Sequence, residues 1–165
     1  MAACAPPPGA VPFLRAYSPS ATDHFYTTNA TEMDIAVNSL GYSAEGNAGY
    51  IYNNTIGPFV VFTVALYRMY SPSRTDHYYT TSYTDREAAI NGGGYNDEGI
   101  AGYVYNHSTC YNMALYEAYS SAYPDHFYTQ NISEMGYAVH NLGYDGLQIG
   151  AYVLPYSPPL LTEDA

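Results

Sequence analysis

An aspartate followed directly by a histidine occurs three times in the chain, and each pair begins a short aromatic segment. The segments read Asp-His-Phe-Tyr-Thr from residue 23, Asp-His-Tyr-Tyr-Thr from residue 76 and Asp-His-Phe-Tyr-Thr from residue 125. A carboxylate beside an imidazole could serve as a catalytic dyad, and three imidazoles that converge on one axis could bind zinc. Neither use is favoured, because no serine or cysteine nucleophile recurs beside the pairs and no cysteine supports a zinc site. We expect no enzyme activity, no metal and no cofactor.

The recognition of sugars is a second use of these residues. A tyrosine ring can pack against the apolar face of a pyranose, while aspartate, asparagine and histidine bond its hydroxyl groups. The chain has 22 tyrosines, and its formal net charge of −11, with four arginines and no lysine, disfavours nucleic acid and membranes as partners. We expect a non-enzymatic carbohydrate-binding module of lectin type, for neutral glycans or cell-wall polysaccharide, with a degraded third site. The candidate ligand-binding residues are Asp23, His24, Tyr26, Tyr50, Asp76, His77, Tyr79, Tyr103, Asp125, His126 and Tyr128.

A plainer interpretation places nearly all the tyrosines in the core, where they would seal the contacts between repeats. The chain would then be a structural or protein-interaction module without a small-molecule ligand. A hydrolase-associated or metal-binding domain is a further alternative, and homo-oligomers are compatible with each of these functions. Binding to a glycan array would separate the lectin hypothesis from the structural one.

Arginine and glutamate change together between the repeats. Arg15 and Arg68 give way to Glu117 in the third repeat, where Leu147 also replaces the glutamate of the other two. This joint loss predicts one ion pair in each of the first two repeats, because a buried arginine is costly without a partner. We interpret each pair as a contact that stabilises its own repeat. The alternative is that the free lone pairs of the glutamates accept hydrogen bonds from sugar hydroxyls. The predicted pairs are Arg15–Glu45 and Arg68–Glu98.

These residues recur because the chain contains an internal threefold repeat. Each histidine is followed 17 positions later by a glycine and a tyrosine, and another tyrosine stands nine residues after that glycine. Two aromatic segments around turn residues predict a β-hairpin in each copy. A capping side chain three residues before an acid then predicts a helix that the glycine ends, and a turn and a third strand follow. The predicted caps are Asn29, Ser82 and Asn131, and the predicted third strands are 48–53, 101–106 and 150–154.

The expected fold is therefore an α+β domain with pseudo-threefold symmetry, in which three strand-strand-helix-strand units surround a central axis. A β-trefoil is the alternative, and it would require the regions around Met33, Ala88 and Met135 not to be helical. The expected boundaries are a flexible Pro-rich arm at 1–10, one domain at 11–155 with repeats 11–54, 63–107 and 112–155, and a tail at 156–165.

The cysteines and the first residues bear on the compartment. Cys4 and Cys110 set no disulfide framework, and the sequence does not favour a bridge between them. Residues 1–12 do not resemble a signal peptide, and no run of 18 apolar residues predicts a membrane-spanning helix. The expected location is the cytoplasm, or outside the cell by a route without a recognisable signal peptide. Formal glycosylation sequons, which we expect to be inert, begin at Asn29, Asn53, Asn106 and Asn131.

The composite motif of the second repeat resembles a known family. It consists of Leu-Tyr-Arg-x-Tyr-Ser-Pro from residue 66, Asp-His-Tyr-Tyr-Thr-Thr from residue 76 and Gly-Tyr-x-x-Glu-Gly-x-Ala-Gly-Tyr-Val-Tyr from residue 94. The motif resembles the tyrosine-rich "DHFYTT" repeat domain of fungal and bacterial proteins, largely a domain of unknown function, and the resemblance covers about residues 13–154. It implies a three-repeat module with a cell-wall or glycan-binding role and carries no catalytic residues. Glu117, Ser121 and Leu147 depart from the pattern, which weakens the case for a third equivalent site.

Overall fold

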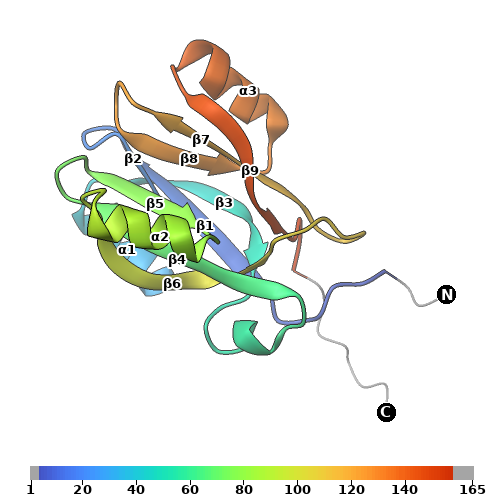
Figure 1. Cartoon of the computed structure of the whole chain (residues 1–165). Coiled ribbons are helices and arrows are strands. Elements are labelled where there is room, and N and C mark those ends of the chain that lie inside the picture. The colour runs from blue at the N-terminus through green and yellow to red at the C-terminus, as the bar shows by residue number, and fades with distance from the viewer. Residues whose placement is uncertain (1–3, 158–165) are drawn as a thin grey trace.

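The computed structural model describes residues 4–157, and within them it has an α+β fold of nine strands, three α-helices and a short 3-10 helix, η1 (Figure 1). Strands form a three-stranded sheet in the order β2-β1-β3 and a six-stranded sheet in the order β5-β4-β6-β9-β7-β8. We call residues 11–54, 63–107 and 112–155 units 1, 2 and 3. The elements are β1 (Val11–Ser18), β2 (Asp23–Thr27), α1 (Ala30–Ser39), β3 (Ser43–Ile51), η1 (Gly57–Phe59), β4 (Thr63–Ser71), β5 (Asp76–Thr80), α2 (Tyr83–Asn91), β6 (Asn96–Tyr105), β7 (Met113–Ser120), β8 (Asp125–Thr129), α3 (Ile132–Asn141) and β9 (Asp145–Val153).

The helices begin at the predicted caps. Asn29 Oδ1 accepts hydrogen bonds from the N–H groups of Thr31 and Glu32 at 3.0 and 3.2 Å. Asn131 caps α3 with the same two bonds, and Ser82 caps α2 with one bond, from the N–H of Asp85. Such caps satisfy amide groups that have no partner inside the helix. The predicted helices are confirmed, and they exclude the β-trefoil alternative.

The third strand of each unit begins earlier than predicted, at Ser43, Asn96 and Asp145, directly after the Gly-Tyr pair. The sequence predicted a turn there because these segments contain serine, asparagine, aspartate and glycine. The structure instead keeps the strands paired through irregularities in their register. A glycine with positive φ lies in each such segment, and a bulge accommodates residues of this kind without ending the strand. The turn prediction was wrong for this reason.

Three buried tyrosines join the units in a closed ring of hydrogen bonds. The Tyr79 hydroxyl donates to the carbonyl of Tyr26 at 2.6 Å and accepts from the N–H of Tyr26 at 2.8 Å. Tyr26 makes the same two bonds to Tyr128, and Tyr128 makes them to Tyr79. The rings meet edge to face with centroids 5.4 to 5.5 Å apart, and none of the three residues is more than 2% exposed. These tyrosines are therefore the centre of the core.

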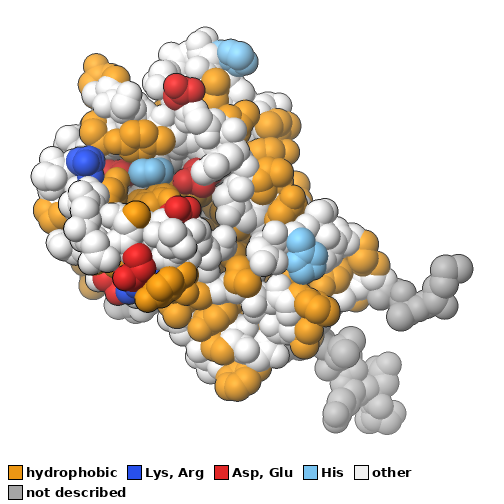
Figure 2. Space-filling view, viewed as in Figure 1, with side chains coloured by type: hydrophobic (Ala, Val, Ile, Leu, Met, Phe, Trp, Pro, Cys, Tyr) orange, Lys and Arg blue, Asp and Glu red, His pale blue; other side chains and the backbone are white. Residues whose placement is uncertain are grey.

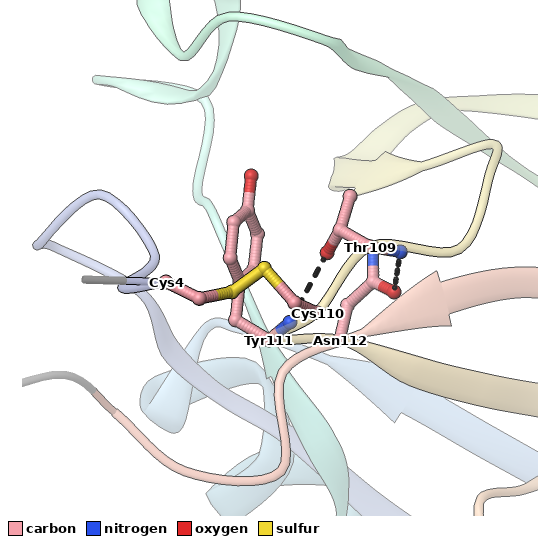
Figure 3. The surroundings of a disulfide bond; sticks show 5 residues. All are labelled: Cys4, Thr109, Cys110, Tyr111 and Asn112. Atoms are coloured by element: carbon pink, nitrogen blue, oxygen red, sulfur yellow. Dashed lines mark hydrogen bonds between the residues drawn. A yellow bond between two sulfur atoms is a disulfide. The ribbon is translucent and has the colours of Figure 1, made fainter. Parts of the chain in front are cut away.

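The N-terminal segment packs against the domain. The Tyr52 hydroxyl donates to the carbonyl of Pro7 at 2.8 Å, and Ala10 is buried. Cys4 forms a disulfide with Cys110 in the loop between β6 and β7 (Figure 3). Residues 4–10 are thus not a free arm, and the expectation of unpaired cysteines is corrected. The cysteines are 106 positions apart in the sequence, and only the fold brings their Cα atoms to 6.1 Å.

Other parts of the expected arm and tail, residues 1–3 and 158–165, lie outside the described residues.

The linker between β3 and β4 exposes apolar side chains, and Phe59, Val61 and Phe62 are 84%, 65% and 69% exposed. Figure 2 shows hydrophobic side chains at the lower end of the molecule, where Figure 1 places η1. None of the described helices is long and apolar enough to cross a membrane.

Tyr79→Phe tests the tyrosine ring. The change removes a hydroxyl that serves two buried backbone groups, so we expect the free energy of unfolding to fall by roughly 1–3 kcal/mol. Urea denaturation followed by circular dichroism measures the change, with Tyr83→Phe on an exposed tyrosine as the control. An unchanged urea midpoint for Tyr79→Phe would show that the ring contributes nothing to stability.

Cys4→Ser tests the disulfide. The bridge closes a loop of 106 residues and restricts the unfolded chain, so we expect its loss to lower the free energy of unfolding by about 2–4 kcal/mol. Oxidised wild type, reduced wild type and the variant are compared by urea denaturation. Reduced wild type should match the variant, and coincident curves for all three samples would contradict the expected stabilisation.

Candidate ligand-binding site

The Asp-His pairs act between units rather than within them. Asp23 of unit 1 accepts a hydrogen bond from the backbone N–H of His77 in unit 2 at 2.8 Å, and its Oδ2 lies 2.6 Å from His77 Nδ1. The hydroxyl of Tyr42 donates to the same carboxylate. Each aspartate therefore receives three hydrogen bonds, two of them from the next unit. The equivalent sets are Asp76 with His126 and Tyr95, and Asp125 with His24 and Tyr144.

The three aspartates form a buried cluster. Asp23, Asp76 and Asp125 are completely buried, and one carboxylate oxygen from each lies within 4.8 Å of the others. Within residues 4–157, this is the group of side chains whose spacing could suit a metal ion. The carboxylates already accept hydrogen bonds from histidine and tyrosine, however, so we interpret the cluster as a hydrogen-bond network. The zinc alternative required three histidines that converge on one axis, whereas among residues 4–157 the ligand atoms that converge belong to the three aspartates, and each histidine lies at a different boundary.

Each histidine ring lies between two aromatic rings. For His77 these are Tyr70 and Phe25, with centroids 4.5 and 5.0 Å away. Burial disfavours the charged form, but hydrogen bonds to Asp23 and Glu98 outweigh this effect and raise the pKa of His77 to about 9. The imidazolium therefore offsets part of the buried negative charge at neutral pH.

Arg68 binds two glutamates across the boundary between units 1 and 2. Its Nε lies 3.0 Å from Glu98 Oε1 in the same unit, as the joint substitution predicted, and its terminal nitrogens donate to both oxygens of Glu32 in unit 1 at 3.0 and 2.7 Å. The guanidinium carbon lies 5.3 Å from the centroid of the Phe25 ring. Burial raises the pKa of Glu32, but the bonds from Arg68 and Thr27 outweigh it and hold the pKa below its usual value. The corresponding contacts of unit 3 and unit 1 are Arg15 with Glu45, Glu134 and Phe127.

Sequence reasoning missed Glu32 and Glu134 as partners of the arginines. The sequence used both acids only as the acidic residues three positions after a helix cap, and nothing in a single repeat reveals a contact with the neighbouring one. At the boundary between units 2 and 3, Glu117 replaces the arginine and is 7% exposed. Burial raises the pKa of Glu117, whose carboxylate accepts a hydrogen bond from Gln148 at 3.1 Å and lies 3.2 Å from the Tyr128 hydroxyl. This third boundary therefore lacks the ion cluster of the other two.

Two cavities with matching walls lie beside the arginine clusters. One, of about 180 Å³, lies between units 1 and 2, and the other, of about 280 Å³, lies between units 3 and 1. Each contains aromatic rings, a leucine, a histidine and the two glutamates that hold the arginine. The matched residues are Phe25 and Phe127, Glu32 and Glu134, Leu40 and Leu142, Tyr42 and Tyr144, His77 and His24, and Glu98 and Glu45.

The structure separates the candidate residues of the sequence into distinct places. His24 and His77 line the cavities, whereas His126 lies at the third boundary. The three aspartates are buried behind the histidines, and Tyr26, Tyr79 and Tyr128 lie in the core. Tyr50 and Tyr103 are half-buried at the opposite end of the sheets; for example, Tyr50 pairs with Pro12, whereas His24 pairs with Tyr17. The buried tyrosines and aspartates present no face to a ligand, and they seal the contacts between units.

The fold and the cavities define an α+β module whose candidate ligand sites lie at the boundaries between its units. The chain belongs to the family described as a domain of unknown function (DUF5648), whose model matches residues 9–154. No curated protein and no solved structure matches the chain.

The stability of the fold should depend on the protonation of His77. The pKa of His77 rises from an ordinary value of 6.5 to about 9 on folding. Protonated His77 therefore contributes fully to the free energy of unfolding below pH 6.5, and this contribution is lost as the pH rises through 9. We expect urea midpoints to fall between pH 6.5 and 9.5, and to fall less in His77→Gln. The lowered pKa values of Glu32 and Glu98 act only at acid pH, outside this window. Equal slopes for wild type and variant would show that His77 does not carry the effect.

Proposed function

We propose that this chain is a non-enzymatic carbohydrate-binding module of lectin type, built from three units with pseudo-threefold symmetry. The recurrence of one cavity at two boundaries supports the proposal. Matching residues line the two cavities, and some of them also stabilise the boundary between units. Such matched linings suit two sites for the same ligand. The third boundary has Glu117 and Leu147 in place of the arginine and glutamate, which fits the degraded third site expected from the sequence.

The composition of the cavities suits a neutral, hydroxylated ligand. Phe25, Tyr42 and Leu40 supply apolar surface for the C–H face of a sugar ring. Glu32 and Glu98 are held by Arg68, yet their side chains remain 36% and 31% exposed, so fixed carboxylates are available to accept hydrogen bonds from hydroxyl groups. Because the arginine neutralises much of their charge, the pair favours a neutral ligand over a cationic one. Acceptors that are already fixed lose little freedom on binding.

Two weak sites on one module can act together on a repetitive polymer, because binding at one site raises the effective concentration of ligand at the other. We therefore propose neutral glycans or cell-wall polysaccharide as the ligand class. The disulfide between Cys4 and Cys110 suits an oxidising compartment, and we propose that the module acts outside the cell. A structural or protein-interaction module is the second candidate function, and the burial of the tyrosine ring supports it.

A glycan array with neutral cell-wall polysaccharides tests the proposed function. Ile35→Ala with Leu40→Ala alters the first cavity, and Tyr137→Ala with Leu142→Ala alters the second; all four side chains are more than half exposed, so the fold should persist. We expect each pair of changes to weaken binding of the polymer and the four together to weaken it at least about tenfold, or about 1.4 kcal/mol. Ile132→Ala, an exposed residue outside both cavities, is the control.

Two results would overturn the proposal. One is the absence of binding to any glycan by the folded protein, and the other is undiminished binding by the folded fourfold variant. Either result would favour the structural candidate.

A further inference from the structure

We propose that the boundary between units 1 and 3 is an extended groove that binds an oligosaccharide chain, with Tyr123 at one end, Tyr137 in the middle, and Asn47 and Gln130 at the other end. The inference rests on the proposed function and adds to it the length of the ligand and the residues that select for length.

Three cavities lie along this boundary, with volumes of about 240, 280 and 420 Å³. Tyr17, Leu142 and Tyr144 line both the first and the second cavity. Glu134 lines both the second and the third. Every residue that lines them belongs to unit 1 or unit 3. The shared walls therefore place the three cavities in a row across a single boundary.

Two exposed tyrosines provide platforms along this row. Tyr123 lines the first cavity and is 66% exposed, and Tyr137 lines the second and is 60% exposed. An exposed tyrosine ring offers a flat apolar face on which a pyranose can stack. Units 1 and 2 lack both platforms. Their counterparts of Tyr123 are Ala21 and Arg74, and those of Tyr137 are Ile35 and Ala88.

The middle of the groove carries fixed charges, and its far end carries amides. Arg15 holds Glu45 and Glu134 beside His24, so carboxylate oxygens are positioned to accept hydrogen bonds from sugar hydroxyls. The third cavity is lined by Asn47 and Gln130 among other polar residues. The oxygen of Asn47 accepts the N–H of Gly49 at 3.1 Å, so its amide nitrogen is the group left to bond a ligand.

The length of the row points to a chain rather than a single sugar. Sites for small molecules typically enclose about 300–1,000 Å³, and the adjoining cavities together reach this range, whereas the cavity of about 180 Å³ between units 1 and 2 does not. Tyr123 and Tyr137 can stack on the faces of pyranose rings, while the carboxylates and amides of the second and third cavities can bond their hydroxyl groups. The two boundaries therefore differ in the length of glycan that each can hold.

Titration calorimetry with oligosaccharide ladders tests the groove. The probes are cellulose, laminarin and chitin oligomers of one to six residues. We expect the affinity for a bound ladder to rise at least tenfold between one residue and four. Tyr123→Ala and Gln130→Ala should each remove part of this gain and leave the shortest bound oligomer unaffected, whereas Tyr137→Ala should weaken every oligomer at this boundary and leave the site between units 1 and 2 intact. Tyr156→Ala, at an exposed tyrosine outside the groove, should change nothing.

The outcomes separate the groove from the proposed function. Binding that does not depend on length, or a gain with length that survives Tyr123→Ala and Gln130→Ala, overturns the groove and leaves the carbohydrate-binding function standing. Failure of the folded protein to bind any of the three ladders also overturns the groove, whereas the proposed function falls only if the protein binds no glycan on the array.

Discussion

The structure depends on three carboxylates that are completely buried and close together. Like charges within 4.8 Å repel one another strongly when water is excluded, so Asp23, Asp76 and Asp125 need strong compensation. Each one obtains it from a backbone N–H and an imidazole of the next unit, and from a tyrosine hydroxyl of its own. No unit contains all the donors that its own aspartate requires. This physical constraint explains why the units bury one another so completely.

The cavities follow from the same constraint. The histidine that serves the aspartate of the neighbouring unit also forms part of the boundary surface, and the arginine beside it joins a helix of one unit to a strand of the other. Arginine is suited to this place because its planar guanidinium binds one carboxylate with two nitrogens and leaves the third nitrogen for another. The ion clusters thus fix polar groups beside aromatic rings in the lining of the two cavities. A candidate ligand site at each of two boundaries is a by-product of how the units are joined.

The three boundaries differ at residues outside the tyrosine ring and the aspartate network. The tyrosine ring and the aspartate network are complete at all three boundaries, since the loss of one member would leave buried groups unpaired. The surface positions are free to differ, and unit 3 has tyrosines where the other units have alanine, arginine or isoleucine. Units that are joined by the same contacts but differ at their surfaces can carry candidate sites of unequal size on one small domain.

The sequence by itself determined the helices and the hairpins, because helix caps and hairpin turns depend on residues a few positions apart. Asn29, Ser82 and Asn131 cap the three helices through bonds to N–H groups two or three residues further along the chain. The joint change of Arg68 and Glu98 also revealed a contact, since both residues lie in one repeat.

The sequence could not assign the partner of Asp23. Asp23 and His24 are neighbours in a strand, and their side chains point to opposite faces, so each one bonds a different unit. Only the tertiary structure decided this pairing, together with the disulfide, the contacts of Glu32 with Arg68, and the burial of the tyrosines. The tyrosines were ambiguous for a physical reason: a side chain with an apolar ring and a hydroxyl suits a hydrogen-bonded core and a binding surface equally well.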